Sequence, residues 1–136
     1  MAVPFTLLGL DHIVLRVRDI GRMMGFYQEV LGCSLQKIQA EIGLYQLRAG
    51  RQLIDLVPLD GKLGRMGGAG PGAEGRNLEH FCLEVSPFDD AAIRAHLAAH
   101  RVEVGTTGMR NGARGEGLSI YLTDPEGNNV ELKAVL

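Results

Sequence analysis

Two short segments of this 136-residue chain share one pattern of residue types, and each contains one histidine. Residues 11–17 read DHIVLRV and residues 79–85 read EHFCLEV: an acidic residue, a histidine and then alternating apolar positions. Each half of the chain also has one carboxylate between two apolar residues, in Ile54-Asp55-Leu56 and again in Val130-Glu131-Leu132. The chain therefore repeats one pattern, and each repeat offers one imidazole and one carboxylate.

The residue types in this repeat are those of a divalent-metal site. Two imidazoles with one or two carboxylates suit borderline metals such as Ni, Zn, Co, Mn and Fe. A metal with open coordination positions acts as a Lewis acid, and a carboxylate beside it can move a proton. We therefore predict a metal site with His12, His80, Glu131 and Asp55 as ligands, in which Glu131 is the catalytic base. Asp55, one methylene shorter, is either the remaining ligand or a second catalytic base.

Both repeats read as a strand, a helix and three further strands. Alternating hydrophobicity predicts the first strand of each repeat at residues 12–17 and 80–85. Asp19 is the expected N-cap of a helix over residues 20–31, and Ser86-Pro87 is expected to begin the second helix, which runs to about residue 100. The remaining strands are expected at residues 35–38, 44–48 and 52–58 in the first half and at residues 101–106, 119–123 and 129–134 in the second.

Strand alternation separates these candidate ligands from the core. The odd-numbered positions of residues 12–17 are apolar and face the helix, whereas His12 and Arg16 lie on the opposite, free face. His80 takes the same place in the second half, and Asp55 and Glu131 point to the same free faces. If the sheets curve, these faces line a cavity. The predicted fold class is thus α+β, with two tandem βαβββ modules forming a curved mixed sheet around a half-barrel cavity and helices on the outer face.

Length and glycine content indicate one domain made of two modules. A chain of this length buries the core of a single domain. We expect modules at residues 8–60 and 77–136, joined by residues 61–76, which contain seven glycines in sixteen positions. This segment is either a flexible linker or a mobile flap over the site, and the sequence is compatible with both.

Composition argues against several classes of partner. The net charge is −2 and 46% of the residues are hydrophobic, so there is no basic surplus for nucleic acid or for an anionic membrane. No apolar run approaches the roughly 20 residues of a membrane span, and the first ten residues lack the pattern of a signal peptide. The two cysteines have no CxxC spacing, which favours a reducing compartment. We therefore expect a cytoplasmic protein that acts on a small molecule.

Three segments resemble the vicinal oxygen chelate superfamily, which includes glyoxalase I, the small extradiol dioxygenases, and the fosfomycin- and bleomycin-resistance proteins. They are residues 10–17 (LDHIVLRV), residues 26–32 (FYQEVLG) and residues 118–132 (LSIYLTDPEGNNVEL). The resemblance covers nearly the whole chain, and it implies one glyoxalase-like domain over residues 1–136.

The resemblance to glyoxalase I implies a specific function. It implies a metal-dependent lyase or isomerase that acts on a glutathione thiohemiacetal or a related α-hydroxycarbonyl, with a carboxylate as proton shuttle. It also implies a homodimer, because the modules of two chains often complete each other's half-barrel. The residues at functional positions are His12, Asp55, His80 and Glu131 as metal ligands, and Arg16 and Arg76 as basic groups for the carboxylates of glutathione.

The chain also departs from glyoxalase I, and three alternatives stay open. Asp55 replaces the usual glutamate, and Leu59 stands where an asparagine commonly helps to hold glutathione. Fosfomycin transferases share the GEG and SIY pattern of residues 116–127 and use two histidines and one glutamate. Extradiol dioxygenases use a similar set around Fe(II), and bleomycin-resistance proteins are metal-free binding modules.

Overall fold

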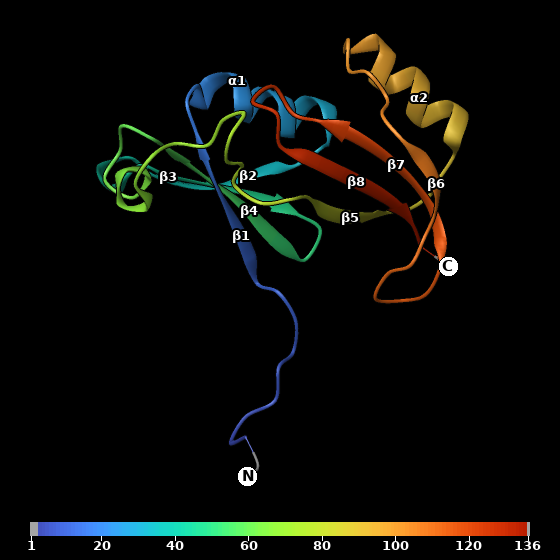
Figure 1. The fold of residues 1–136 in the computed structure, drawn as a ribbon, viewed down its shortest axis with the longest axis horizontal. Helices are drawn as coiled ribbons and strands as arrows, with labels where there is room; N and C mark the ends of the chain where they lie inside the picture. Colours follow the sequence, from blue (N-terminus) through green and yellow to red (C-terminus); the bar gives the residue numbers. More distant parts are fainter. Residues whose placement is uncertain (1–2, 136) are drawn as a thin grey trace.

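The computed structural model describes residues 3–135 and contains two four-stranded mixed sheets (Figure 1). The first sheet has the order β1-β4-β3-β2 and the second the order β5-β8-β7-β6. In each sheet the first and last strands of the module run parallel, and the other pairs are antiparallel. The strands are β1 (His12–Val17), β2 (Ser34–Gln39), β3 (Leu44–Ala49), β4 (Gln52–Pro58), β5 (Phe81–Val85), β6 (Thr107–Arg110), β7 (Gly117–Thr123) and β8 (Asn129–Ala134). The predicted α+β fold with two βαβββ modules is confirmed, and each module forms a sheet of its own.

The first helix begins where its capping residue predicts. The Asp19 carboxylate accepts a hydrogen bond from the Arg22 backbone N–H at 3.0 Å, which satisfies one of the free donors of the first turn. The helix is regular only over α1 (Ile20–Gly25), and it continues as a π-helical stretch at Phe26–Val30.

The second helix begins later than the sequence suggests. Helix α2 spans Asp90–Ala99, and Asp89 is its N-cap, because the Asp89 carboxylate accepts from the Ala92 N–H at 3.1 Å. The prediction that Ser86 caps this helix is therefore wrong. The prediction of a strand at residues 101–106 is also wrong, because the regular pairing of β6 with β7 begins only at Thr107. Before it, the Gly105 N–H donates to the Tyr121 carbonyl, and the Tyr121 N–H donates to the Thr106 carbonyl.

Both modules contribute to one hydrophobic core. The apolar faces of the two sheets pack with the helices, which Figure 1 shows on the side of the molecule opposite the N-terminus. The most deeply buried members are Leu15, Val17, Met23, Tyr27, Leu47, Leu56, Ile120 and Val130, none of which is exposed to solvent. The sheet faces that bear the histidines therefore point away from the shared core.

Polar side chains fix the two modules to each other along β1. Asn77 accepts from the Arg16 N–H at 3.2 Å and donates to the Arg16 carbonyl at 3.0 Å. Glu126, from the turn between β7 and β8, accepts from the Arg18 and Asp19 N–H groups, both at 2.7 Å. Strand β1 lies at the edge of its sheet, so no neighbouring strand pairs with the Arg16 backbone groups on its outer side. Asn77 satisfies them instead, and together with Glu126 it sets the position of the second module.

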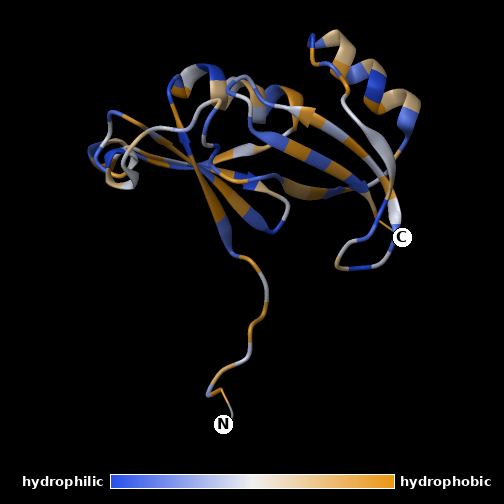
Figure 2. Cartoon of the chain, in the orientation of Figure 1, coloured by the Kyte–Doolittle hydropathy of each residue, from blue (hydrophilic) through white to orange (hydrophobic). Residues whose placement is uncertain are grey.

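Residues 3–11, which we call the arm, extend away from the body of the protein before β1 (Figure 1). Figure 2 shows apolar segments along the arm. Within residues 3–135, its backbone makes no hydrogen bond to the body before Asp11, whose carbonyl accepts from the Leu53 N–H at 3.1 Å. Across the same residues, no helix has the length and apolar character needed to cross a membrane.

Candidate metal centre in two halves

The first half-site comprises His12 and Asp55 with the residues that orient them. His12 begins β1 and Asp55 lies on the neighbouring strand β4, where it pairs with Val14. The His12 Nε2 atom lies 3.9 Å from the Asp55 Oδ2 atom. The other ring nitrogen, Nδ1, lies 2.6 Å from the carboxylate of Asp11. Gln46 on β3 donates its amide to both Asp55 oxygens at 3.4 Å.

The surroundings change the pKa of both groups in this half-site. The hydrogen bond that His12 Nδ1–H donates to the Asp11 carboxylate raises the pKa of His12, with a further contribution from the charge of Asp55. Burial raises the pKa of Asp55, although the hydrogen bond from Gln46 and the charge of His12 act in the opposite direction. A cation placed beside this pair would favour the charged carboxylate and the neutral imidazole, which is the protonation state a metal requires.

The second half-site comprises His80 and Glu131 in the equivalent places of the second sheet. Cys82 pairs with Glu131 as Val14 pairs with Asp55. The His80 Nε2 atom lies 3.2 Å from the Glu131 Oε1 atom. Two hydroxyl groups of β7 donate to this carboxylate, Ser119 to Oε2 at 2.6 Å and Tyr121 to Oε1 at 2.8 Å.

These hydrogen bonds keep Glu131 ionised although it is 4% exposed. Burial alone would raise the pKa of Glu131, but the hydrogen bonds from Ser119 and Tyr121 and the charge of His80 together lower it. The hydrogen bond that His80 Nδ1–H donates to the Glu79 carboxylate raises the pKa of His80. The second half-site therefore presents a fixed, charged carboxylate beside an imidazole.

Both histidines are oriented by the acidic residue that precedes them. Asp11 and Glu79 bond the Nδ1 atoms, and this leaves each Nε2 atom turned toward the carboxylate on the neighbouring strand. Histidines that bind metals commonly engage a carboxylate through the nitrogen that does not bind. Sequence reasoning noted the repeated acid but assigned it no role. It also missed Ser119 and Tyr121, whose signal is their alternation on the strand that pairs with Glu131.

The structure places the four candidate ligands in two pairs, not in one cluster. His12 and Asp55 lie on the first sheet, whereas His80 and Glu131 lie on the second. In the part of the chain that the structure describes, no three His, Cys, Asp or Glu side chains are close enough together to hold a metal ion. Each half-site of a single chain thus offers two donors, fewer than the three or four of known sites.

A pocket of about 620 Å³ lies over the first half-site and is lined by His12, Asp55, Arg16 and Arg76 among others. The Arg16 guanidinium donates to the carbonyl oxygens of Gly68 and Ala69, at 3.1 and 2.9 Å. Arg16 therefore holds the glycine-rich segment against β1. A Cβ atom at Gly67 would lie 2.5 Å from the Arg16 Nη1 atom, so a larger residue there would displace the guanidinium from this position.

A second pocket, of about 450 Å³, lies beside the second half-site. His80 and Tyr121 line it, and the Arg110 guanidinium lies 5.6 Å from the centre of the Tyr121 ring. Sequence reasoning missed Arg110, because it lies between the strands expected at residues 101–106 and 119–123, whereas the structure places it at the end of β6. Both volumes fall in the range of small-molecule sites, and each pocket contains a cation that could bind an anionic substrate.

The fold is that of a known superfamily. The model of the Glyoxalase/Bleomycin resistance protein/Dioxygenase superfamily matches residues 9–132, and the chain belongs to this superfamily. The superfamily contains both lyases and resistance proteins that act on small molecules.

One relative shares a third of its sequence with this chain. It is virulence protein STM3117 of Salmonella typhimurium, 33% identical over 129 residues, which are 90% of this chain and 81% of the relative. Its crystal structure has a TM-score of 0.76 and covers 97% of this chain and all of the other, with 27% identity in the structural alignment.

Two solved structures of named activity share the fold. Lactoylglutathione lyase from Agrobacterium tumefaciens has a TM-score of 0.65 and 19% identity, covering 94% of each chain. Fosfomycin resistance protein FosX from Mesorhizobium loti has a TM-score of 0.67 and 17% identity, covering 96% of this chain and 95% of the other. At these identities the similarity shows the fold alone.

Proposed function

We propose that this protein is a metal-dependent enzyme of the glyoxalase type, which isomerises a small substrate with two neighbouring oxygens. The observation that carries the proposal is the matched pair of half-sites. In both, a histidine Nε2 faces a buried carboxylate while an adjacent acid holds Nδ1. A structural role would not require the same two-part arrangement on both sheets. The lactoylglutathione lyase fold supports this choice of reaction.

The complete site is proposed to take one half from each of two chains. One copy supplies His12 and Asp55, and a second copy supplies His80 and Glu131. A twofold axis through such a dimer would create two identical sites from the four half-sites. This arrangement agrees with the separation of the donors on two sheets of one chain.

The donors fit a divalent metal by type, since imidazole nitrogen and carboxylate oxygen suit Ni, Zn, Co, Mn or Fe. His12, His80 and Glu131 would hold the ion, with Asp55 as the fourth ligand or as a second base. When bound, the ion would supply Lewis-acid polarisation of neighbouring substrate oxygens.

The side chains of this chain then have separate roles. Glu131 removes the proton from the carbon that bears the hydroxyl group, and the protonated Glu131 carboxyl then protonates the former carbonyl carbon. The hydroxyl proton passes to the former carbonyl oxygen, so the substrate isomerises without net gain or loss of protons. Ser119 and Tyr121 hold the Glu131 carboxylate in position during this transfer. Arg76 binds a carboxylate of the substrate, whose carboxylates are proposed to be those of glutathione. Arg16 binds another once it releases the carbonyl oxygens of Gly68 and Ala69.

The test combines metal analysis with a chemical assay. Tag-free protein is dialysed against a mixture of Ni, Zn, Co and Mn, and bound metal is measured by elemental analysis. The loaded protein is then incubated in D2O with the hemithioacetal of glutathione and a 2-oxoaldehyde, and the product is examined by NMR. We expect about one metal per chain, as a dimer with two sites requires, and isomerised product that carries deuterium at the new C–H to the extent that the Glu131 carboxyl exchanges its proton with D2O before it protonates the carbon.

Two variants make the assay specific. Glu131→Gln should abolish turnover, whereas Glu84→Gln should not, because Glu84 lies on the same sheet face but pairs with Arg114 at the surface. Near-normal turnover by Glu131→Gln would contradict the mechanism. If the dialysed protein retains no metal, a protein that binds a small molecule without catalysis becomes the better proposal for its function.

A second candidate is a metal-dependent resistance enzyme of the fosfomycin type. It is favoured by Arg110, which stacks over Tyr121 next to Glu131 and would suit a phosphonate group. The FosX fold agrees with it. Loss of an epoxide phosphonate from the reaction mixture, with no isomerisation of hemithioacetal, would select this candidate.

A further inference from the structure

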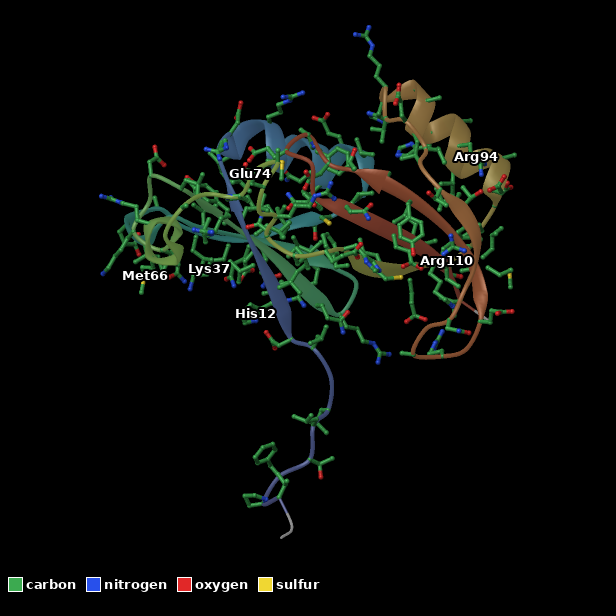
Figure 3. The ribbon with its side chains drawn as sticks, in the orientation of Figure 1. His12, Lys37, Met66, Glu74, Arg94 and Arg110 are labelled. Carbon is green, nitrogen blue, oxygen red and sulfur yellow. The ribbon has the colours of Figure 1, made fainter. Side chains whose placement is uncertain are left out.

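The arm carries an unusual amount of exposed apolar surface. Val3, Phe5, Leu7, Leu8 and Leu10 are 64%, 65%, 85%, 98% and 75% exposed. These five apolar side chains lie within eight consecutive residues, and exposed apolar side chains gathered in this way commonly mark a binding surface. In Figure 3 the side chains of this segment project into open space, away from the body of the protein.

The arm is fixed at one end only. Asp11 anchors it through two contacts: its carbonyl accepts from the Leu53 N–H, and its carboxylate bonds His12 Nδ1. Within the described residues, the preceding backbone groups have no partner in the body of the same chain. An extended segment with free N–H and C=O groups and apolar side chains is suited to pair with another surface.

The position of the anchor indicates which molecule covers the arm. Asp11 belongs to the first half-site, so any chain that completes this half-site lies against the base of the arm. Under the proposed function, on which this step rests, that chain is a second copy, and the part of it nearest His12 is the sheet that bears His80 and Glu131. The eight residues before Asp11 can span about 26 Å, which is enough to cross most of a four-stranded sheet with strands about 4.8 Å apart.

The second sheet has an exposed edge strand and an exposed apolar side chain on which an apolar segment can dock. Strand β6 lies at its outer edge and pairs only with β7, and Met109 on β6 is 53% exposed. The geometry points to an exchange of arms between two copies of the chain. The arm of each copy docks beside β6, on the second sheet of the other copy, and the two arms hold the dimer together next to the proposed metal sites. A twofold dimer buries both arms in the same way.

The test measures dimer affinity by analytical ultracentrifugation, without metal and with Zn²⁺. Three proteins are compared: the full chain, Leu7→Ser with Leu8→Ser, and Leu35→Ser with Ile38→Ser. The last pair is a matched control, because Leu35 and Ile38 are also exposed apolar residues, 46% and 45%, on the edge strand β2 of the other sheet. We expect the arm variant to raise the dimer Kd at least tenfold and the control to change it less than twofold. Circular dichroism should be the same for all three, since the arm is outside the core.

A second measurement identifies the surface on which the arm docks. In a mixture of methyl-labelled and unlabelled full chains, isotope-filtered NMR should show contacts between the Leu7 or Leu8 methyl groups of one copy and the Met109 methyl group of the other. An unchanged dimer Kd in the arm variant would overturn the proposal, as would contacts found only within one chain or with a surface other than the second sheet.

These outcomes separate the arm from the proposed function. If the arm variant weakens the dimer and the isotope-filtered contacts reach Met109, but no variant holds metal, the arm exchange stands and the proposed enzyme fails. If metal is bound across two chains at full strength and the arm variant dimerises normally, the arm exchange alone fails. A full chain that stays monomeric at every concentration overturns both.

Discussion

Mixing two defective variants tests whether each metal site takes its ligands from two chains. His12→Ala removes a proposed ligand from the first half-site and His80→Ala removes one from the second, so under the proposed function neither variant forms a complete site alone. After random exchange of subunits at equal concentrations, about half of the dimers are mixed. In a mixed dimer, one site combines His12 and Asp55 of one chain with His80 and Glu131 of the other, while the second site lacks both histidines. The mixture should therefore bind about one quarter of the metal that the wild type binds.

The assay is isothermal titration with Zn²⁺ after the variants are unfolded together and refolded. A mixture of His80→Ala with Glu131→Ala is the control, because both changes fall in the second half-site and no pairing of these chains restores it. The two-chain site requires recovery in the first mixture and none in the control. Equal binding in the two mixtures, or none in either, would refute the reasoning.

Three further results are expected. Tyr27→Phe should lower the free energy of unfolding by about 2 kcal/mol in denaturant titrations, because it removes a buried 2.7 Å hydrogen bond to the Asp124 carboxylate; a change near zero would show that the Asp124 carboxylate is satisfied without it. Asp11→Asn should weaken Zn²⁺ binding about 10- to 100-fold, as measured by competition with a chelating dye, and unchanged affinity would exclude Asp11 from orienting the ligand. Because neighbouring carboxylates raise the pKa of His12 and His80 above 6.5, protons should compete with the metal already near neutral pH. Zn²⁺ affinity measured from pH 6 to 8.5 should therefore rise with pH, and a flat profile would contradict the assignment.

Much of the fold follows from local sequence, because alternation and caps act over a few residues. The pattern of residues 12–17 predicts both β1 and the face on which His12 lies, and Asp19 predicts the start of α1. The second module shows the limit of this reasoning. Ser86 and Asp89 have similar capping chemistry, and only the backbone path decided that Asp89 caps α2.

The candidate site shows a different limit. The repeat predicts which residue types are present and which strands bear them, but not how the modules are placed. That placement depends on contacts between residues far apart in the chain, such as Asn77 with Arg16 and Glu126 with Arg18. No local pattern marks these contacts. The sequence therefore could not show that the two pairs of donors stay apart within one chain, nor that Arg16 holds the glycine-rich segment.

The orientation of each histidine by its immediate neighbour has a consequence for how such proteins evolve. Since the orienting acid and the histidine are consecutive residues, a duplication that copies a short stretch of gene copies a preorganised imidazole with it. The two copies can then diverge in the rest of the module, as Asp55 and Glu131 have done here, without loss of the imidazole geometry. A scaffold of this kind can acquire new substrates by changing its carboxylates and loops while its histidines are inherited unchanged.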